Sequence, residues 1–285
     1  MSPPTVAIVT DSTSDLDAAR ARALGVEVVP LFVNFGDVRY RDRVDLSLDE
    51  FYTKLAAEKQ LPTTAQPTPA MFEAAFRPHV EAHRPIVCLT IMASLSGTIN
   101  AATAAARTFP DAEIHIVDSG TVTGGLALET EHAAALARTG ASAVDIVAAL
   151  EHDVRTLRGY ATVPDLSHAV RTGRVSRAQA FVGSLVKIVP VLRIDSGAIA
   201  EHARVRTFAR ALDTMVDAVL AEANRADGAR VCVVHSHAPA EAQKLVDRLR
   251  AGVTTQLEEL DLLEAGPVIG THAGLGAVGI FILPP

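Results

Sequence analysis

The sequence predicts an α/β protein whose N-terminal part has a mainly parallel sheet and whose C-terminal part is of the α+β type. Three observations lead to this prediction. Strand-like and helical segments alternate through the first half, shorter strand candidates follow from about residue 157, and 49% of the 285 residues are hydrophobic. This content is enough for two cores, so we expect two domains, residues 1–156 and 157–285. No low-complexity linker separates them, which indicates a tight junction.

Apolar runs and segments of helical periodicity alternate in the N-terminal part. The strand candidates are residues 6–9, 26–32, 86–91 and 114–117. The helix candidates are residues 16–24, 48–58, 71–80, 100–108 and 124–138. This alternation is typical of βαβ units around a parallel sheet, whose ligands bind at the carboxyl ends of the strands. Three polar clusters follow predicted strands, and we expect them to converge on one crevice: residues 11–14, 94–98 and 118–121.

The C-terminal part shows a different spacing. Its strand candidates are residues 161–163, 186–194, 231–235 and 278–283. Its main helix candidates are residues 211–223 and 238–251. Apolar side chains recur at helical spacing in the first of these helices, which predicts a buried face. These side chains are Leu212, Met215, Val216, Val219 and Leu220.

The composition excludes several functional classes. The net charge is −7 and the 26 Lys and Arg residues are scattered, so we expect neither nucleic acid nor anionic membrane as a partner. The longest apolar run, residues 277–283, is too short for stable membrane insertion. No basic segment leads into an apolar one near residue 1, so we expect a cytoplasmic protein. Cys88 and Cys232 lie in apolar runs, which favours free buried thiols.

Residues 94–98 are the most informative segment of the chain. A buried strand breaks there into Ser94, Ser96, Gly97 and Thr98, just where an alanine-rich helix is expected to begin. The first N–H groups of a helix lack intrahelical partners and carry the positive end of the helix dipole. Hydroxyl groups at that place can hold a carboxylate or a phosphate. The alternative is an ordinary N-cap for the helix.

Residues 61–69 form a rigid, hydroxyl-rich turn before the helix candidate 71–80. Thr68 is explained as an N-cap and Pro69 as the first helical residue. Thr63, Thr64 and Gln66 remain for another role, either in ligand binding or in hydrogen bonds within the loop.

Two further segments carry side chains suited to an anionic ligand. Arg174 follows a glycine in a helix-ending turn, where it is either solvated or supplies a charged fork to a carboxylate or phosphate. Thr271 and His272 lie in a glycine-dense tail, residues 266–279. The glycines there indicate either close backbone approach to a ligand or simply turn geometry.

Two catalytic interpretations fail on spacing. Ser96 with His272 as its base lacks the glycines that a nucleophile elbow requires at positions 94 and 98. His235 and His237 are a possible metal-binding pair, but no Cys, Asp or Glu cluster at a suitable spacing accompanies them. We therefore expect no metal and no cofactor.

Taken together, six short motifs resemble the DegV family of bacterial fatty-acid-binding proteins, and they occur in the family's order over nearly the whole chain. They are residues 9–15, 63–67, 95–98, 117–119, 172–176 and 270–274. The resemblance implies a Rossmann-like N-terminal domain, with one long-chain, palmitate-like fatty acid held between it and the C-terminal domain. It also implies that the carboxylate is presented to a separate fatty acid kinase.

The resemblance assigns the carboxylate to hydroxyls at Thr64 and Ser96, with Arg174 and His272 near the headgroup. We include Gly97 and Thr271, their chain neighbours, in this ligand set. The apolar segment of the C-terminal part is the expected wall for the acyl chain, with plain core packing as the alternative: Phe181, Val182, Leu185 and Ile188. The chain departs from the family at Ala65, at Thr172 and at Val189, where the family usually has Ser, Gly and Lys.

Two other functions stay open at this point. One is a self-contained enzyme that acts on a small carbonyl or phosphorylated substrate through His272, since the second domain also resembles that of dihydroxyacetone kinases. The other is a regulatory protein whose bound lipid only reports lipid status. A long apolar tunnel favours the carrier or the regulator, whereas a compact polar pocket favours the enzyme.

Overall fold

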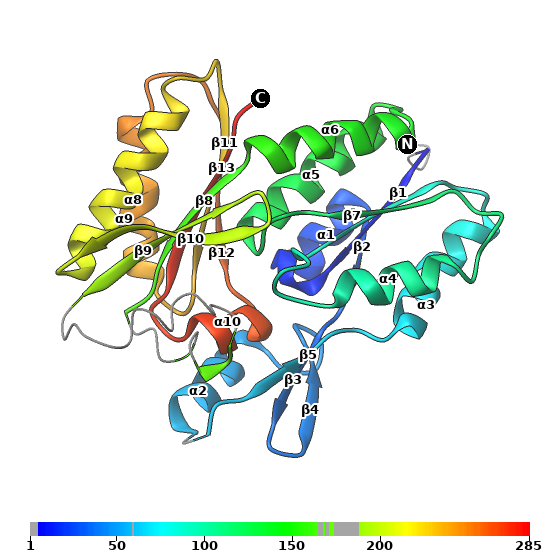
Figure 1. Ribbon diagram of the computed structural model, residues 1–285, viewed down its shortest axis with the longest axis horizontal. Coiled ribbons are helices and arrows are strands. Elements are labelled where there is room, and N and C mark those ends of the chain that lie inside the picture. The colour runs from blue at the N-terminus through cyan, green and yellow to red at the C-terminus, as the bar shows by residue number, and fades with distance from the viewer. Residues whose placement is uncertain (1–4, 59, 165–167, 169–170, 174–187) are drawn as a thin grey trace.

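The computed structural model describes residues 5–58, 60–164, 168, 171–173 and 188–285. The elements stack in alternating helical and sheet layers (Figure 1). Helices α3 (Pro69–Glu81) and α4 (Thr98–Ala106) cover the outer face of the N-terminal sheet. Helices α8 (Phe208–Ala223) and α9 (Pro239–Gly252) cover the outer face of the C-terminal sheet. A helical layer between the two sheets joins the halves.

The N-terminal sheet has four parallel strands in the order β2-β1-β6-β7. The strands are β1 (Ala7–Asp11), β2 (Val26–Val29), β6 (Ile86–Thr90) and β7 (Ile114–Asp118). A single 3₁₀ turn, Ser12–Ser14, follows β1. The inner face packs against α1 (Ala18–Leu24), α5 (Gly124–Arg138) and α6 (Ala143–Thr156). The predicted parallel α/β arrangement is confirmed.

The C-terminal sheet is mixed and six-stranded, in the order β10-β9-β8-β13-β11-β12, with only the β11–β12 pair parallel among these strands. Its strands are β8 (Arg158–Thr162), β9 (Val189–Asp195), β10 (Ala198–Val205), β11 (Ala229–His235), β12 (Leu257–Glu264) and β13 (Val278–Leu283). On α8, the predicted apolar face is buried, apart from the half-buried Leu220. The mixed sheet agrees with the predicted α+β class.

Helix α5 lies between the two sheets, and glycines make this close approach possible. A methyl group on Gly124 would lie 2.7 Å from Cγ2 of Val234 and 2.8 Å from Sγ of Cys232, both on β11. A methyl group on Gly125 would lie 2.9 Å from Cδ1 of Phe281 on β13. Any side chain at these positions would push the helix away from the C-terminal sheet. One apolar cluster therefore spans both halves.

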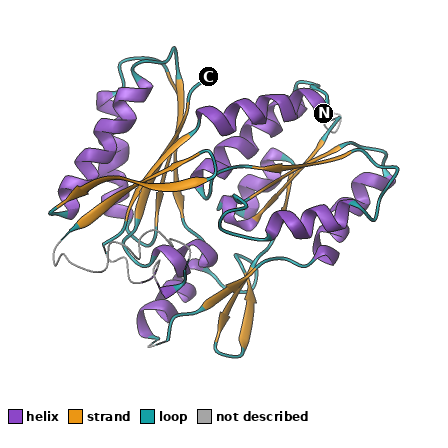
Figure 2. Cartoon of the chain, viewed as in Figure 1, coloured by secondary structure: helices purple, strands orange, loops and turns teal. Residues whose placement is uncertain are grey.

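A third, three-stranded sheet projects from the layered body (Figures 1 and 2). It consists of β3 (Phe32–Phe35), β4 (Val38–Arg41) and β5 (Thr63–Ala65). Helices α2 (Leu48–Ala57) and α10 (Pro267–Ala273) pack against each other beside it. Their shared core brings Phe51 and Tyr52 of α2 together with Val33 of β3 and Val268 of α10. The C-terminal tail is thus tied to an N-terminal segment.

Several sequence predictions need correction. Residues 26–32 are not one strand, because Pro30 has no N–H to donate and the chain leaves the parallel sheet after Val29. The glycine-dense tail contains α10 rather than only a loop. Strands β10 and β12 were missed because they are edge strands with many exposed polar side chains. Cys88 and Cys232 are buried and unbridged, as expected.

The boundary expected at residue 156 falls between α6 and β8, and the division into two domains stays a prediction. No helix in the part of the chain that the structure describes is long and apolar enough to cross a bilayer.

Candidate ligand-binding cavity

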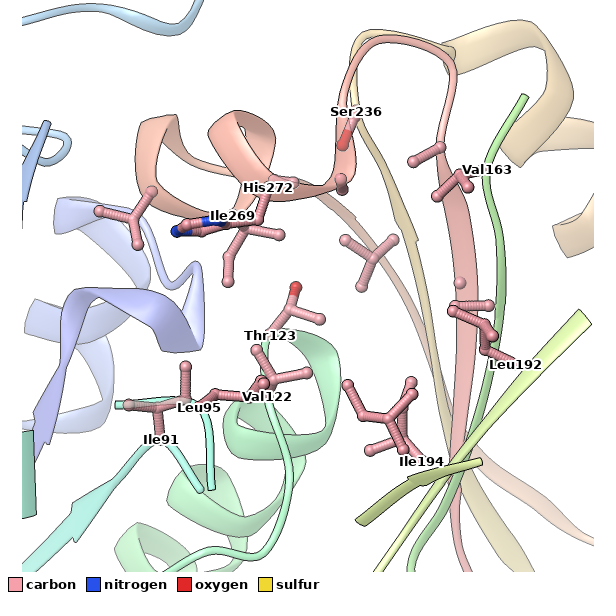
Figure 3. A pocket seen from close by; sticks show the side chains of 18 of the residues that line it. Ile91, Leu95, Val122, Thr123, Val163, Leu192, Ile194, Ser236, Ile269 and His272 are labelled. Carbon is pink, nitrogen blue, oxygen red and sulfur yellow. The ribbon is translucent and has the colours of Figure 1, made fainter. Parts of the chain in front are cut away.

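A cavity of about 460 Å³ lies where the two halves and α10 meet. In Figure 3, Ile91, Leu95 and Val122 from the N-terminal half lie across the cavity from Leu192 and Ile194 of β9. The volume falls within the range of small-molecule sites, about 300–1,000 Å³. Most lining residues are apolar, so an apolar ligand gains free energy by leaving water here. Further apolar lining comes from Leu31, Ala161, Val163, Ile199, Val234, Val268, Ile269 and Phe281.

Polar groups from distant segments form one end of the cavity, hereafter the polar end: Thr64, Gln66, Ser96, Gly97 and His272. Thr64 lies on β5 and His272 on α10, and Thr64 Oγ1 is 2.8 Å from His272 Nε2. Ser96 and Gly97 follow β6 and precede α4. A methyl group on Gly97 would lie only 2.3 Å from Oε1 of Gln66, so the two segments touch.

Ser96 serves both the helix and the cavity. Its hydroxyl lies 2.8 Å from Oγ1 of Thr98 and accepts the backbone N–H of Thr98 at 3.3 Å. Helix α4 begins at Thr98, two residues before the predicted start, and its N-cap is Gly97 without a side-chain cap. Ser96 also lines the cavity. The helix-start interpretation and the ligand-seat interpretation are therefore compatible.

The structure does not place Thr271 with the polar end. Its side chain is fully buried and its hydroxyl donates to the Pro267 carbonyl at 2.8 Å. Thr271 is not among the described residues that line the cavity, whereas its neighbour His272 is. Ile188 is half-buried and is not among the described residues that line the cavity. Arg174, Phe181, Val182 and Leu185 lie outside the described residues.

Comparison with known proteins identifies the family. The model of the DegV family, which is described as uncharacterised, matches residues 5–285. The chain belongs to the DegV family. A DegV domain-containing protein of Halalkalibacterium halodurans is 37% identical over 278 residues, which cover 96% of this chain and 97% of that protein.

Solved DegV structures share the whole fold. A DegV family protein from Thermus thermophilus, described as binding fatty acid, superposes with a TM-score of 0.92 at 31% identity, over 98% of this chain and 99% of that one. A stearic-acid-binding protein from Eubacterium ventriosum gives a TM-score of 0.89 at 26% identity, over 98% of each chain. These relatives confirm the predicted fold class and the resemblance to the DegV family.

The three polar clusters of this DegV protein do lie at one edge of the parallel sheet, but they have different roles. Asp11 accepts the Ile91 N–H at 2.8 Å, and Asp118 accepts the N–H groups of Ala93 and Gly120, each at 3.1 Å. These carboxylates therefore hold the loops after β6 and β7. Of the three clusters, only the middle one contributes described lining residues, namely Leu95, Ser96 and Gly97.

Sequence reasoning missed four polar lining residues: Thr123, Thr162, His235 and Ser236. His235 and Ser236 lie at the carboxyl end of β11, where the strand-end rule could have found them. Thr123 adopts a positive φ of 49° and its hydroxyl donates to Asp15 at 2.5 Å. Burial lowers the pKa of His235 and favours its neutral form.

His235 at the end of β11 and His237 just after it do not form a shared metal site. His235 lines the cavity, whereas His237 stacks on Tyr52 with ring centroids 5.1 Å apart. Elsewhere, three carboxylates within the described chain lie within 4.8 Å of one another: Glu131, Glu259 and Asp261. Arg20 pairs with all three, so this cluster joins α1 and α5 to β12.

Burial also perturbs acidic groups beside the cavity. Asp42 is buried, and desolvation raises the pKa of its carboxyl to about 7, although the Ser12 hydroxyl donates to it. Desolvation likewise raises the pKa of Asp11 to about 6, against the hydrogen bonds from Thr13 and Ile91. Both groups hold a proton more tightly in the folded chain than in the unfolded one.

A pH-dependent stability follows from Asp42. Its raised pKa stabilises the folded state fully below about pH 4, and this contribution is lost as the pH rises through about 7. Between about pH 5 and about pH 8, the natural protein should therefore lose stability relative to Asp42→Asn, by at most about 1.4 kcal/mol per pH unit. Urea unfolding of both proteins across this range measures the difference. A difference that is independent of pH would contradict the assignment.

Proposed function

We propose that this DegV protein binds one long-chain fatty acid in the cavity, with the carboxylate at the polar end, and presents it to a separate fatty acid kinase. The observation that carries the proposal is a mainly apolar cavity with a polar end that contains Thr64, Ser96 and His272. Structural relatives described as binding fatty acid or stearic acid support the same ligand class.

The apolar wall supplies most of the binding free energy. Burial contributes about 0.8 kcal/mol per methylene, so a palmitate-like chain of about sixteen carbons gains on the order of 10 kcal/mol before ordering costs. The headgroup contributes less, about 1.5–3 kcal/mol for each hydrogen bond to the charged carboxylate. Its main effect is to decide which end of the lipid lies among Thr64, Ser96 and Gln66.

The Thr64–His272 pair sets a condition on headgroup binding. A hydroxyl has one proton, so Thr64 donates to a carboxylate only if His272 donates its Nε2 proton to Oγ1 of Thr64. We propose this tautomer for the loaded protein. Thr64 and Ser96 then donate to the carboxylate, with Arg174 as a further charged partner in the proposed set. This end thus gathers several hydrogen-bonding groups for the headgroup, whereas most of the other residues that line the cavity are apolar.

The proposed reaction is phosphoryl transfer to the bound lipid. A carboxylate oxygen attacks the γ-phosphorus of ATP held by the kinase, the bond to the β-phosphate oxygen breaks, and the products are an acyl phosphate and ADP. In this scheme the DegV protein is a carrier that orients the carboxylate and shields the chain from water. The nucleotide and the groups that stabilise the transferred phosphate belong to the partner.

Mass spectrometry tests the binding proposal directly. The purified protein is measured under native conditions, then after organic extraction, and again after incubation with a fatty acid mixture. We expect one long-chain fatty acid per chain in the first or last measurement. A protein that stays empty throughout would overturn the proposal and favour the small-substrate enzyme that acts through His272.

A second assay separates the carrier from the regulator. The loaded protein is mixed with a bacterial fatty acid kinase and ATP, and acyl phosphate is trapped with hydroxylamine. A carrier yields hydroxamate in proportion to the bound lipid. A regulator binds the same lipid but yields none.

A further inference from the structure

Helix α10 carries His272, but little within its own sequence fixes where the helix begins. It has only seven residues, Pro267–Ala273, and its N-cap residue, Gly266, has no side chain to cap it. Pro267 offers no N–H. A short helix of this kind depends on tertiary contacts for its position. Those contacts therefore decide where His272 lies relative to Thr64.

Two buried aspartates from the N-terminal half supply the contacts. Asp15 accepts the Gly266 N–H at 2.8 Å, and Asp42 accepts the Val268 N–H at 3.4 Å. They lie 251 and 226 residues away in the chain from these partners. A carboxyl oxygen at a helix start is favourable because it accepts from N–H groups that have no partner within the helix.

The second oxygen of each aspartate is held from elsewhere. Asp15 accepts from Thr123, which lines the cavity at the start of α5. Asp42 accepts from Ser12 at 2.7 Å, in the turn after β1. Asp15 thus connects α10 to the α5 side of the cavity, and Asp42 connects α10 to the parallel sheet.

The contact between α10 and this pair is tight. A methyl group on Gly266 would lie 2.8 Å from Nε of Arg43, 3.0 Å from Oδ1 of Asp15 and 3.1 Å from Oδ1 of Asp42. Arg43 also lies 3.5 Å from Asp15 and donates to the Glu264 carbonyl just before the helix. The start of α10 therefore has almost no room to move without breaking these bonds.

We infer that Asp15 and Asp42 are positioning residues for the carboxylate-binding end of the cavity. They do not line the cavity, and they act by holding the start of α10 so that His272 meets Thr64. This inference rests on the proposed function, because it assigns His272 to the headgroup of a fatty acid.

The test compares Asp42→Ala, Asp15→Ala and the conservative Asp42→Asn, whose amide oxygen still accepts the Val268 N–H. Asp153→Ala is the matched control, since Asp153 is buried and hydrogen-bonded to His132 but does not line the cavity. Binding of cis-parinaric acid, a fluorescent long-chain fatty acid, gives the affinity. NMR of the imidazole nitrogens of His272 in the lipid-free protein reports its tautomer and hydrogen bond.

We expect about tenfold weaker binding and a shifted His272 signal in both alanine variants, near-normal values in Asp42→Asn, and no change in the control. If the alanine variants do not fold, Gly266→Ala is the alternative. Its methyl group would displace the start of α10 while every charge is retained, so it should shift the same His272 signal. Normal affinity with an unshifted His272 signal in the variants that fold would overturn the inference. Failure of the natural, delipidated protein to bind the probe would instead overturn the proposed function.

Discussion

Substituting Thr64→Ala and Ser96→Ala together is expected to weaken binding of a long-chain fatty acid by about a hundredfold or more. Each hydroxyl is proposed to donate to the carboxylate, and each such bond is worth about 1.5–3 kcal/mol. Neither side chain belongs to a large apolar cluster, so the fold should tolerate the change. Titration of the delipidated protein with a fluorescent fatty acid measures the loss.

The matched control is Thr63→Ala with Ser94→Ala, which removes hydroxyls from the same two segments. Thr63 and Ser94 are exposed and do not line the cavity. This control should bind the fatty acid like the natural protein. The methyl ester of the same acid gives a second comparison, because it lacks the charge and should bind the natural and double-substituted proteins almost equally. Equal affinity of the two proteins for the free acid would contradict the headgroup assignment.

Phe281→Ala is expected to lower the free energy of unfolding by about 3–5 kcal/mol. Phe281 is almost completely buried on β13 and fills the space that glycines leave on α5 and β8. A methyl group on Gly159 would lie 2.5 Å from Cε1 of the ring. Neither α5 nor β8 has a side chain there that could fill the space left by the ring. We therefore expect this space to stay open rather than to collapse.

Urea unfolding of the delipidated protein measures this loss. Phe109→Ala is the control, because Phe109 is only half-buried near the end of α4 and its removal should cost much less. Gly159→Ala sharpens the test: it should destabilise the natural protein by about 1–3 kcal/mol through overpacking but much less when Phe281 is already Ala. Additive effects of the two substitutions would show that the ring and the glycine do not compete for the same space.

The parallel sheet of the N-terminal half and most of its helices could be predicted because their signals are local. Helix α5 and strand β13 have the predicted bounds, and the other predicted helices begin or end within about two or three residues of theirs. Thr64, Ser96 and His272, which the sequence motifs singled out, all line the cavity. Edge strands such as β10 carry no such local signal, since most side chains of β10 are exposed and none is fully buried.

Which of these residues meet was decided by tertiary structure. The local pattern treated Thr271 and His272 alike, but helical geometry buries one against Pro267 and turns the other toward Thr64. The sequence analysis gave Asp15 and Asp42 no individual role, yet both accept hydrogen bonds at the start of α10 from more than two hundred residues away.

The sequence by itself determined the α/β class, the buried strands and the hydroxyl-rich segments, because periodicity and turn chemistry act over a few neighbouring residues. Only the tertiary structure decided that β5, the β6–α4 loop and α10 enclose one polar end, and that glycines on α5 let two sheets share a core. The physical reason is that packing joins surfaces far apart in the chain, and their fit depends on the shape of both partners rather than on either segment alone.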